Sequence, residues 1–247
     1  MADFYLGGTA LNQVWLGNTQ INNIPDYLIK SDTLSANFNT WDNSSYPGTG
    51  TTWTNLVSGG GDFNLVNSPV FTSGDINYFT FNTSSYATGS LTYMTPGPLS
   101  YAMMQAWVEV PTGDDDDGVI FFGDKGTSSN FQLGIKTNGN LLVEFQNNTG
   151  NFTGSASYNI LNQWVNIAAT LEDEGFYARI KGYVNGEYVG EYLQAGDLSL
   201  DNQIQLPPDN SISFSYKISQ LLVSKDASDI SPDVIYRNYY ATRYRFE

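Results

Sequence analysis

Carboxylates are the first candidates for chemistry, because the sequence holds 25 Asp and Glu residues and no histidine or cysteine. Glycoside hydrolysis uses two carboxylates, about 5–5.5 Å apart in retaining enzymes and about 6.5–9.5 Å apart in inverting ones. Glu172, Asp173 and Glu174 are consecutive, so a strand would turn Asp173 to the opposite face. Glu187 and Glu191 share a strand face but lie roughly 13 Å apart along it. Neither spacing supports glycoside hydrolysis, and we predict that the chain is not an enzyme.

A second set of acids has the composition of a calcium site. The stretch "GDDDDG" spans 113–118, and Asp124 ends the apolar run that follows it. Calcium takes roughly six to eight oxygen ligands, which makes Asp114, Asp116 and Asp124 candidate ligands. The alternative is a solvated hairpin tip, since four adjacent Asp side chains cannot all point inward. We expect no other cofactor, and calcium is the one that the sequence leaves open.

A third candidate is a glycan-binding surface, in which aromatic rings lie beside polar side chains. The candidate residues are Trp41, Tyr46, Trp53, Tyr177 and Arg179. The first three flank a Gly-rich loop that could present them outward. The last two lie on the mixed aromatic and polar face of one predicted strand. A half-exposed sheet face without a ligand has the same composition, which is the alternative.

The charge balance excludes several partners. The formal net charge is −15, with only 10 Lys and Arg residues. Nucleic-acid binding needs a basic surface, and an anionic membrane is disfavoured for the same reason. The N-terminus lacks the features of a secretory signal, and no apolar run reaches the roughly 18 residues of a spanning helix. We expect a protein made in a reducing cytosol, with no membrane insertion.

Period-2 alternation predicts that most of the chain is β-strand. Strands are expected at 77–82, 100–110, 118–124, 130–137, 140–146, 164–171, 176–184, 187–193 and 212–224. Asn138-Gly139 and Asn185-Gly186 predict two-residue hairpin turns. The predicted class is all-β: a two-sheet antiparallel jelly-roll sandwich with an N-terminal β-arm.

One short helix is predicted near the C-terminus. Ser231 has the type of an N-cap residue, and Pro232 follows it at the first helical position. The helix is expected to run to about Tyr240, with a last strand near 244–246.

Five stretches of the chain resemble a known family: 51–71, 76–88, 106–110, 162–191 and 218–246. The more specific motifs are "QWVNIAAT" with "YVNG", and "NYYATRYRF". They resemble the laminin-G-like branch of the concanavalin A-like lectin/glucanase jelly rolls, in the form common among bacteriophage virion proteins. The resemblance covers about 33–247 and implies a buried Trp164. The family's catalytic pattern E-x-D-x-E is absent from this chain.

The first residues repeat a ten-residue phrase, "YLGGT" and then "WLGNT". Gly7-Gly8 and Gly17-Asn18 are expected to turn the chain into small β-arcs, which bury little on their own. The phrases are similar to N-terminal pieces of phage tail and fibre proteins. We interpret residues 1–24 as a docking arm whose Tyr5, Leu6, Trp15 and Leu16 need a partner surface. Pro25 then begins the jelly roll, 25–247. The alternative is an arm that pads its own sandwich.

The predicted function is structural. We expect a non-enzymatic phage virion component, either capsid decoration or part of a tail or fibre, that is anchored to other virion proteins by its arm. Its displayed lectin-like domain would serve either adsorption to host surface glycans or reinforcement of the shell. A homo-trimer would suit a fibre or a capsid three-fold axis. The expected location is the virion, after synthesis in the host cytoplasm. The alternative is a free carbohydrate-binding lectin.

Overall fold

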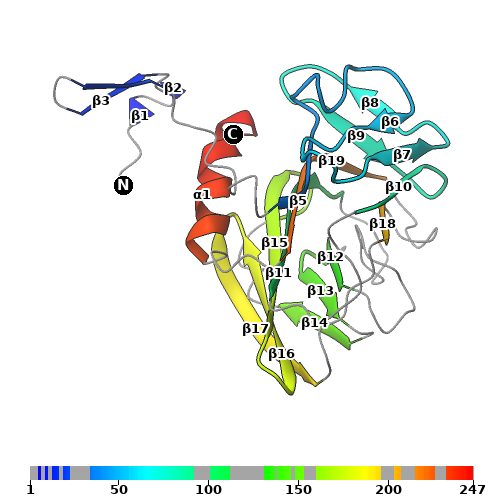
Figure 1. The fold of residues 1–247 in the computed structure, drawn as a ribbon, viewed down its shortest axis with the longest axis vertical. Helices are drawn as coiled ribbons and strands as arrows, with labels where there is room; N and C mark the ends of the chain where they lie inside the picture. The colour runs from blue at the N-terminus through cyan, green and yellow to red at the C-terminus, as the bar shows by residue number, and fades with distance from the viewer. Residues whose placement is uncertain are drawn as a thin grey trace.

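A computed structural model describes residues 5–6, 9–10, 13–16, 19–22, 34–91, 101–111, 131–136, 138–145, 148–152, 160–195, 203–206, 215–225 and 232–246. Within these residues the chain is an antiparallel β-sandwich with one short C-terminal helix (Figure 1). The predicted all-β class is confirmed. The predicted strands that fall on described residues are present except for the last one, near 244–246, while 118–124 lies outside the described residues.

One eight-stranded sheet forms the larger layer. Its strands run in the order β17–β16–β15–β11–β19–β9–β8, and β5 also pairs with β19. Their bounds are β5 Leu34–Asn39, β8 Val70–Thr72, β9 Tyr78–Phe81, β11 Tyr101–Glu109, β15 Trp164–Asp173, β16 Tyr177–Val184, β17 Glu187–Ala195 and β19 Tyr216–Lys225. β9 pairs with 216–218 of β19 and β5 with 220–224, so the two share one side of that strand.

Two smaller sheets form the opposite layer, in the orders β18–β10–β7–β6 and β12–β13–β14. Their bounds are β6 Thr52–Trp53, β7 Phe63–Val66, β10 Tyr86–Ser90, β12 Phe131–Ile135, β13 Leu141–Phe145, β14 Asn148–Phe152 and β18 Gln203–Leu206. β12 and β13 lie against β15 and β16 of the large sheet. The apolar core fills the space between the layers.

Strand alternation decides which side chains fill this core. On β11, the predicted apolar set Ala102, Met104, Ala106 and Val108 is buried in it. Phe38 and Phe63 add a stacked ring pair, 4.1 Å between centroids. The other side chains of β11 therefore face outward from the sandwich, and this second side of the large sheet is called the outer face.

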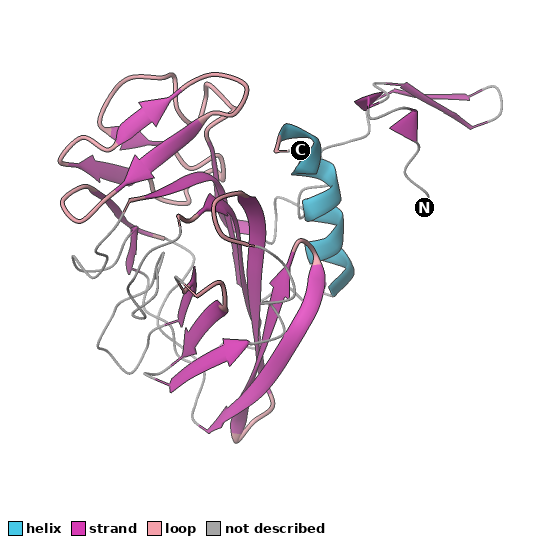
Figure 2. Cartoon of the chain, turned by 180° about the vertical axis from the view of Figure 1, so that it is seen from behind, coloured by secondary structure: helices cyan, strands magenta, loops and turns pink. Residues whose placement is uncertain are grey.

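The helix α1, Pro232–Thr242, packs on the outer face (Figures 1 and 2). Its Ile235 is buried in a small cluster with Met103 and Leu222, apart from the main core. A helix starting at Pro232 is confirmed, while Ser231 lies outside the described residues.

The predicted last strand near 244–246 is wrong. Arg243–Arg245 form a 3-10 turn, η2, directly after α1, and the Phe246 N–H donates to the Arg243 carbonyl at 2.8 Å. The aromatic ring of Phe246 packs on Trp107 and Trp164. These contacts anchor the end of the chain by side-chain packing in place of strand pairing.

The hairpin turns follow the Asn-Gly pairs. Asn185 and Gly186 have φ values of 50° and 79°, as a type I′ turn between β16 and β17 requires. Gly139, between β12 and β13, has a φ of 84°. Both predicted turns are therefore confirmed as connections between consecutive strands.

Short hairpins occupy the N-terminal arm. β1 (Tyr5–Leu6) pairs with β2 (Thr9–Ala10), and β3 (Gln13–Leu16) pairs with β4 (Thr19–Asn22). The side chains named for docking, Tyr5, Leu6, Trp15 and Leu16, lie outside what the structure describes, as does Pro25. Their role and the boundary between residues 24 and 25 stay predictions.

Candidate functional site

α1 covers the middle of the outer face through a buried polar network. Gln105 Nε2 donates to Asn166 Oδ1 at 2.8 Å and to the Ile235 carbonyl at 3.1 Å. Asn238 Nδ2 donates to Gln105 Oε1 at 2.9 Å. The partly exposed side chains of the outer face therefore gather in two places, on either side of the residues that α1 covers.

Aromatic rings from four parts of the chain gather on one side. Trp41, Tyr78, Trp164 and Phe246, all partly exposed, are called the aromatic platform. The Trp164 ring lies 5.6 Å from the Tyr78 ring and 5.2 Å from the Phe246 ring, between centroids. The guanidinium of Arg245, the residue before Phe246, lies 5.8 Å from the Trp41 ring centroid.

Specific contacts hold the platform rings in position. Phe246 stacks on Trp107 at 4.0 Å between centroids, and Trp107 Nε1 donates to Thr242 Oγ1 at 2.7 Å. Trp41 Nε1 donates to Ser219 Oγ at 3.0 Å. Rings that are already fixed lose little conformational entropy when a ligand stacks on them.

A charged pair borders the platform. Lys217 Nζ lies 5.1 Å from the Tyr78 ring centroid and 2.6 Å from Glu109 Oε1. The Lys217 and Glu109 side chains are 33% and 24% exposed, so both reach solvent. Aromatic rings can stack on the apolar face of a sugar, while an ammonium and a carboxylate can hydrogen-bond its hydroxyl groups. The platform therefore has the chemistry of a carbohydrate-binding surface.

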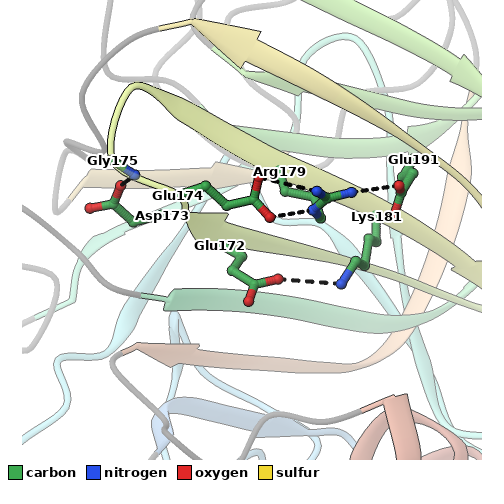
Figure 3. Close-up of polar contacts among 7 residues, drawn as sticks. All are labelled: Glu172, Asp173, Glu174, Gly175, Arg179, Lys181 and Glu191. Atoms are coloured by element: carbon green, nitrogen blue, oxygen red, sulfur yellow. Dashed lines mark hydrogen bonds and ion pairs between the residues drawn. The ribbon is translucent and has the colours of Figure 1, made fainter.

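Ion pairs cross β15, β16 and β17 on the other side of α1 (Figure 3). Arg179 donates from Nε to Glu174 Oε1 and from Nη1 to Glu191 Oε1, each at 2.6 Å. Lys181 Nζ lies 3.3 Å from Glu172 Oε2. These five residues are called the charged ladder.

One carboxylate of the charged ladder is held in its ionised form by Arg179. The hydrogen bond from Arg179 lowers the pKa of Glu174, whereas a glycosidase needs a general acid of raised pKa. Asp173 accepts the Gly175 N–H at 2.7 Å and takes no part in the ion pairs that Figure 3 draws. Among the residues drawn there, the acids are held by cations or by the turn, and none is arranged as an acid–base pair.

The family follows from a comparison with known sequence families. The model of the concanavalin A-like lectin/glucanases superfamily, in its laminin-G form, matches residues 81–211, more than half of the chain. The chain belongs to this superfamily. A search of curated protein sequences found no match.

Solved structures with the same fold include botulinum neurotoxin binding domains. The serotype D binding domain is 16% identical, with a TM-score of 0.63 over 85% of this chain and 51% of that chain. The serotype D ligand-binding domain in complex with N-acetylneuraminic acid is 15% identical, with a TM-score of 0.65 over 88% of this chain and 53% of that chain. A structure of botulinum neurotoxin type C, a toxin whose cell entry depends on interaction with two ganglioside molecules, is 13% identical. Its TM-score is 0.62 over 85% of this chain and 51% of that chain. The chain spans about half the length of these proteins, and the likeness shows the fold.

In this concanavalin A-like domain the five predicted glycan-binding residues do not meet. Trp53 is 0% exposed and Tyr46 is 5% exposed. Their rings pack on Phe79 at 4.9 Å and 4.7 Å between centroids. The prediction that their loop presents both rings outward is wrong, because the loop folds them into the core.

The other three predicted residues lie on or beside the outer face. Trp41 belongs to the aromatic platform. Arg179 belongs to the charged ladder, and Tyr177, at the start of β16, is 50% exposed. Whether any of them binds a glycan stays a prediction.

The sequence-based predictions missed most of the platform. Trp164 was expected in the core, as the resemblance implies, but it lies on the outer face, where it pairs with Glu109 in the strand register. Alternation gives the physical reason: Val165 and Ile167 point into the core, so Trp164 must point away from it. Phe246 carried no such signal, because its packing depends on where η2 ends.

The predicted calcium ligands Asp114, Asp116 and Asp124 lie outside the described residues. Within the described part of the chain, no group of three Asp or Glu side chains is arranged to hold a metal ion. No helix that the structure describes is long and apolar enough to cross a membrane.

Proposed function

We propose that this chain is a non-catalytic, lectin-like module that binds carbohydrate at the aromatic platform. The observation that carries the proposal is the placement of the partly exposed Trp164 and Tyr78 rings beside the Lys217–Glu109 pair. The platform supplies stacking surfaces, a donor and an acceptor within one patch. The carboxylates of the charged ladder are each bound by a cation, which supports a binding role over a catalytic one.

The superfamily supports carbohydrate as the ligand class. Toxin domains with this fold include one in complex with N-acetylneuraminic acid and one that interacts with gangliosides. Arg245 adds a positive charge beside the Lys217–Glu109 pair at the platform, although the whole chain carries −15. Acidic as well as neutral sugars therefore belong in a first screen.

Binding is tested with a glycan array of bacterial surface sugars, followed by calorimetry on any hit. Tyr78→Ala removes an aromatic ring from the platform and is expected to weaken binding roughly tenfold, the equivalent of about 1.4 kcal/mol. Tyr236→Ala is the matched control, since its ring is 45% exposed on α1, outside the platform. If no sugar on the array is bound, or if Tyr78→Ala and Tyr236→Ala bind equally well, the platform is rejected as a glycan site.

We also propose that the module is a phage virion component, a capsid decoration or a tail or fibre part, joined to other polypeptides by residues 1–24. Residues 4–25 contain no charged side chain, although the chain as a whole carries −15. An uncharged segment with aromatic and aliphatic residues suits a docking role, because small hairpins bury little apolar surface alone. Displayed on a particle, the module would adsorb to host glycans.

Particle attachment has its own test. Deleting residues 1–24 should abolish incorporation into particles, which imaging of intact virions would measure. Normal occupancy by the truncated protein would rule out the arm as the anchor. Glycan binding without any particle association would leave the second candidate function, a free lectin.

A further inference from the structure

Exposed apolar side chains gather at one edge of the large sheet. Phe176 is 88% exposed, Tyr177 50% and Leu193 52%. They come from the β15–β16 turn and from the last two strands of the sheet, where Tyr177 pairs with Ala195 and Arg179 with Leu193. These three residues are called the edge patch. Exposed apolar side chains concentrated in one place are typical of an interaction surface.

The edge patch borders a strand that pairs on one side. β17 pairs with β16, with Leu193 opposite Arg179 and Tyr188 opposite Tyr183. Within the described residues it ends the sheet, and the nearby β14 pairs with β13 instead. An edge strand offers main-chain donors and acceptors to an added strand.

The charges beside the patch indicate which kind of partner fits. Arg179 is bound by Glu174 and Glu191, and Lys181 by Glu172, so the cations of the ladder are already paired and an acidic partner would be repelled. A second sheet edge of the same kind would bring the Glu187 and Glu191 carboxylates of the two copies toward one another, on bodies that each carry −15. An extended segment without charge avoids both penalties.

The chain itself contains such a segment. Residues 4–25 carry no charge, and β3 and β4 are extended strands with Trp15, Leu16 and Ile21 among their residues. We propose that the arm of one copy adds to the β17 edge of a second copy, with Trp15 and Leu16 against the edge patch. The inference rests on the proposed docking role of residues 1–24 and names the polypeptide on which they dock.

The position of the arm's connection favours another copy over the same one. Leu34 begins β5, which is separated from β17 by β19, β11, β15 and β16, a distance of roughly 24 Å at ordinary strand spacing. α1 packs on the outer face between them. The connector 23–33 spans at most roughly 36–40 Å when fully extended, so a return to its own edge would use well over half of that length, whereas the edge of another copy sets no such limit.

Arm-to-edge docking is a heterologous contact. Each copy offers one arm and one edge, so the contacts propagate from copy to copy until a ring closes. A closed ring of three would satisfy every arm and every edge, and it matches the homo-trimer expected from the sequence. Such a ring would also present several aromatic platforms at once.

The test uses two full-length variants that each disable one half of the contact. Trp15→Glu places a charge on the arm, and Leu193→Glu places one on the edge patch. Val70→Glu is the matched control, because Val70 is 60% exposed on β8, at the opposite end of the sheet. Multi-angle light scattering measures the mass of each species, and circular dichroism confirms that each variant is folded.

Wild type and Val70→Glu should form a closed oligomer, while Trp15→Glu and Leu193→Glu should each have the mass of one chain, 27.2 kDa. Mixing the two disabled variants should produce a species of twice that mass, because one intact arm then meets one intact edge. A monomeric wild type, an oligomeric Leu193→Glu, a monomeric Val70→Glu or a mixture that stays monomeric would each overturn the inference. Glycan binding by the monomeric variants is measured separately, so failure of the arm contact and failure of the lectin role can be told apart.

Discussion

Phe246 lies flat on Trp107, with 4.0 Å between ring centroids and 12° between ring planes. The stack ties the C-terminal turn to β11, and it also places Phe246 against Trp164 of the aromatic platform. One aromatic pair therefore links the last residues of the chain both to the large sheet and to the candidate binding surface.

Phe246→Ala is expected to lower the free energy of unfolding by about 1–3 kcal/mol, because a partly buried ring loses its stacking partners. Urea denaturation measures the change. Tyr244→Ala is the control, since its ring is 51% exposed, and it should change stability by less than about 0.5 kcal/mol. Equal losses in the two variants would contradict a packing role for Phe246.

Gln105 joins β11, β15 and α1 through side-chain hydrogen bonds. Gln105→Leu should cost about 2–3 kcal/mol, because Asn166 and Asn238 lose buried partners. Adding Asn238→Leu removes one of the stranded groups, so the double variant should be less destabilised than the two single changes added together. Strict additivity in a denaturant-based double-mutant cycle would show that the network is not coupled.

Substitutions at two turn glycines distinguish the energetic cost of backbone strain from the cost of a steric clash with α1. Gly175 and Gly186 have φ values of 86° and 79°. A Cβ on Gly175 would meet nothing within 4 Å, whereas one on Gly186 would lie 3.2 Å from Tyr236 Cα and from Tyr239 Cδ1. Gly175→Ala should therefore cost about 1 kcal/mol of backbone strain, and Gly186→Ala should cost clearly more. Thermal unfolding compares them, and similar costs would mean that α1 shifts freely.

Tyr183 should make the fold sensitive to alkali. Burial raises the pKa of its hydroxyl to about 12, and that hydroxyl has no well-formed hydrogen bond among the described residues. The folded state holds the proton more tightly than the unfolded chain, whose tyrosines titrate near pH 10. The associated stability is therefore fully present below pH 10 and is lost as the pH rises toward 12.

Tyr183→Phe should leave stability at pH 7 unchanged or slightly higher, because the buried hydroxyl that it removes makes no well-formed hydrogen bond. It should also lessen the alkaline loss, as followed by circular dichroism between pH 9 and pH 12. A clear loss of stability at neutral pH would show that the hydroxyl has a partner in solution.

Strands and hairpin turns could be predicted because their signals are local. The apolar spacing in 100–110 gives both faces of β11, since side chains alternate along any strand. Asn185-Gly186 marks a type I′ turn for a similar reason, because few residue pairs tolerate positive φ at both positions. For these elements, neighbours in the sequence carry the information.

The candidate site could be predicted only in part, because it depends on contacts between distant segments. Trp53 and Trp41 flank the same loop, yet one is buried and the other is partly exposed, which depends on how that loop packs over the core. Phe246 reaches the platform only because α1 docks on β11. The Gln105–Ile235 hydrogen bond that helps to dock it joins residues 130 apart in the sequence.

That separation also sets the order of events during translation. At about 5–20 residues per second, a ribosome needs roughly 6–26 seconds to proceed from Gln105 to Ile235. Throughout this interval the nascent chain has no α1 to cover Met103 and Trp107. The emerging polypeptide therefore exposes the apolar side chains of Met103 and Trp107, which chaperones or neighbouring nascent chains can bind before the helix is synthesised.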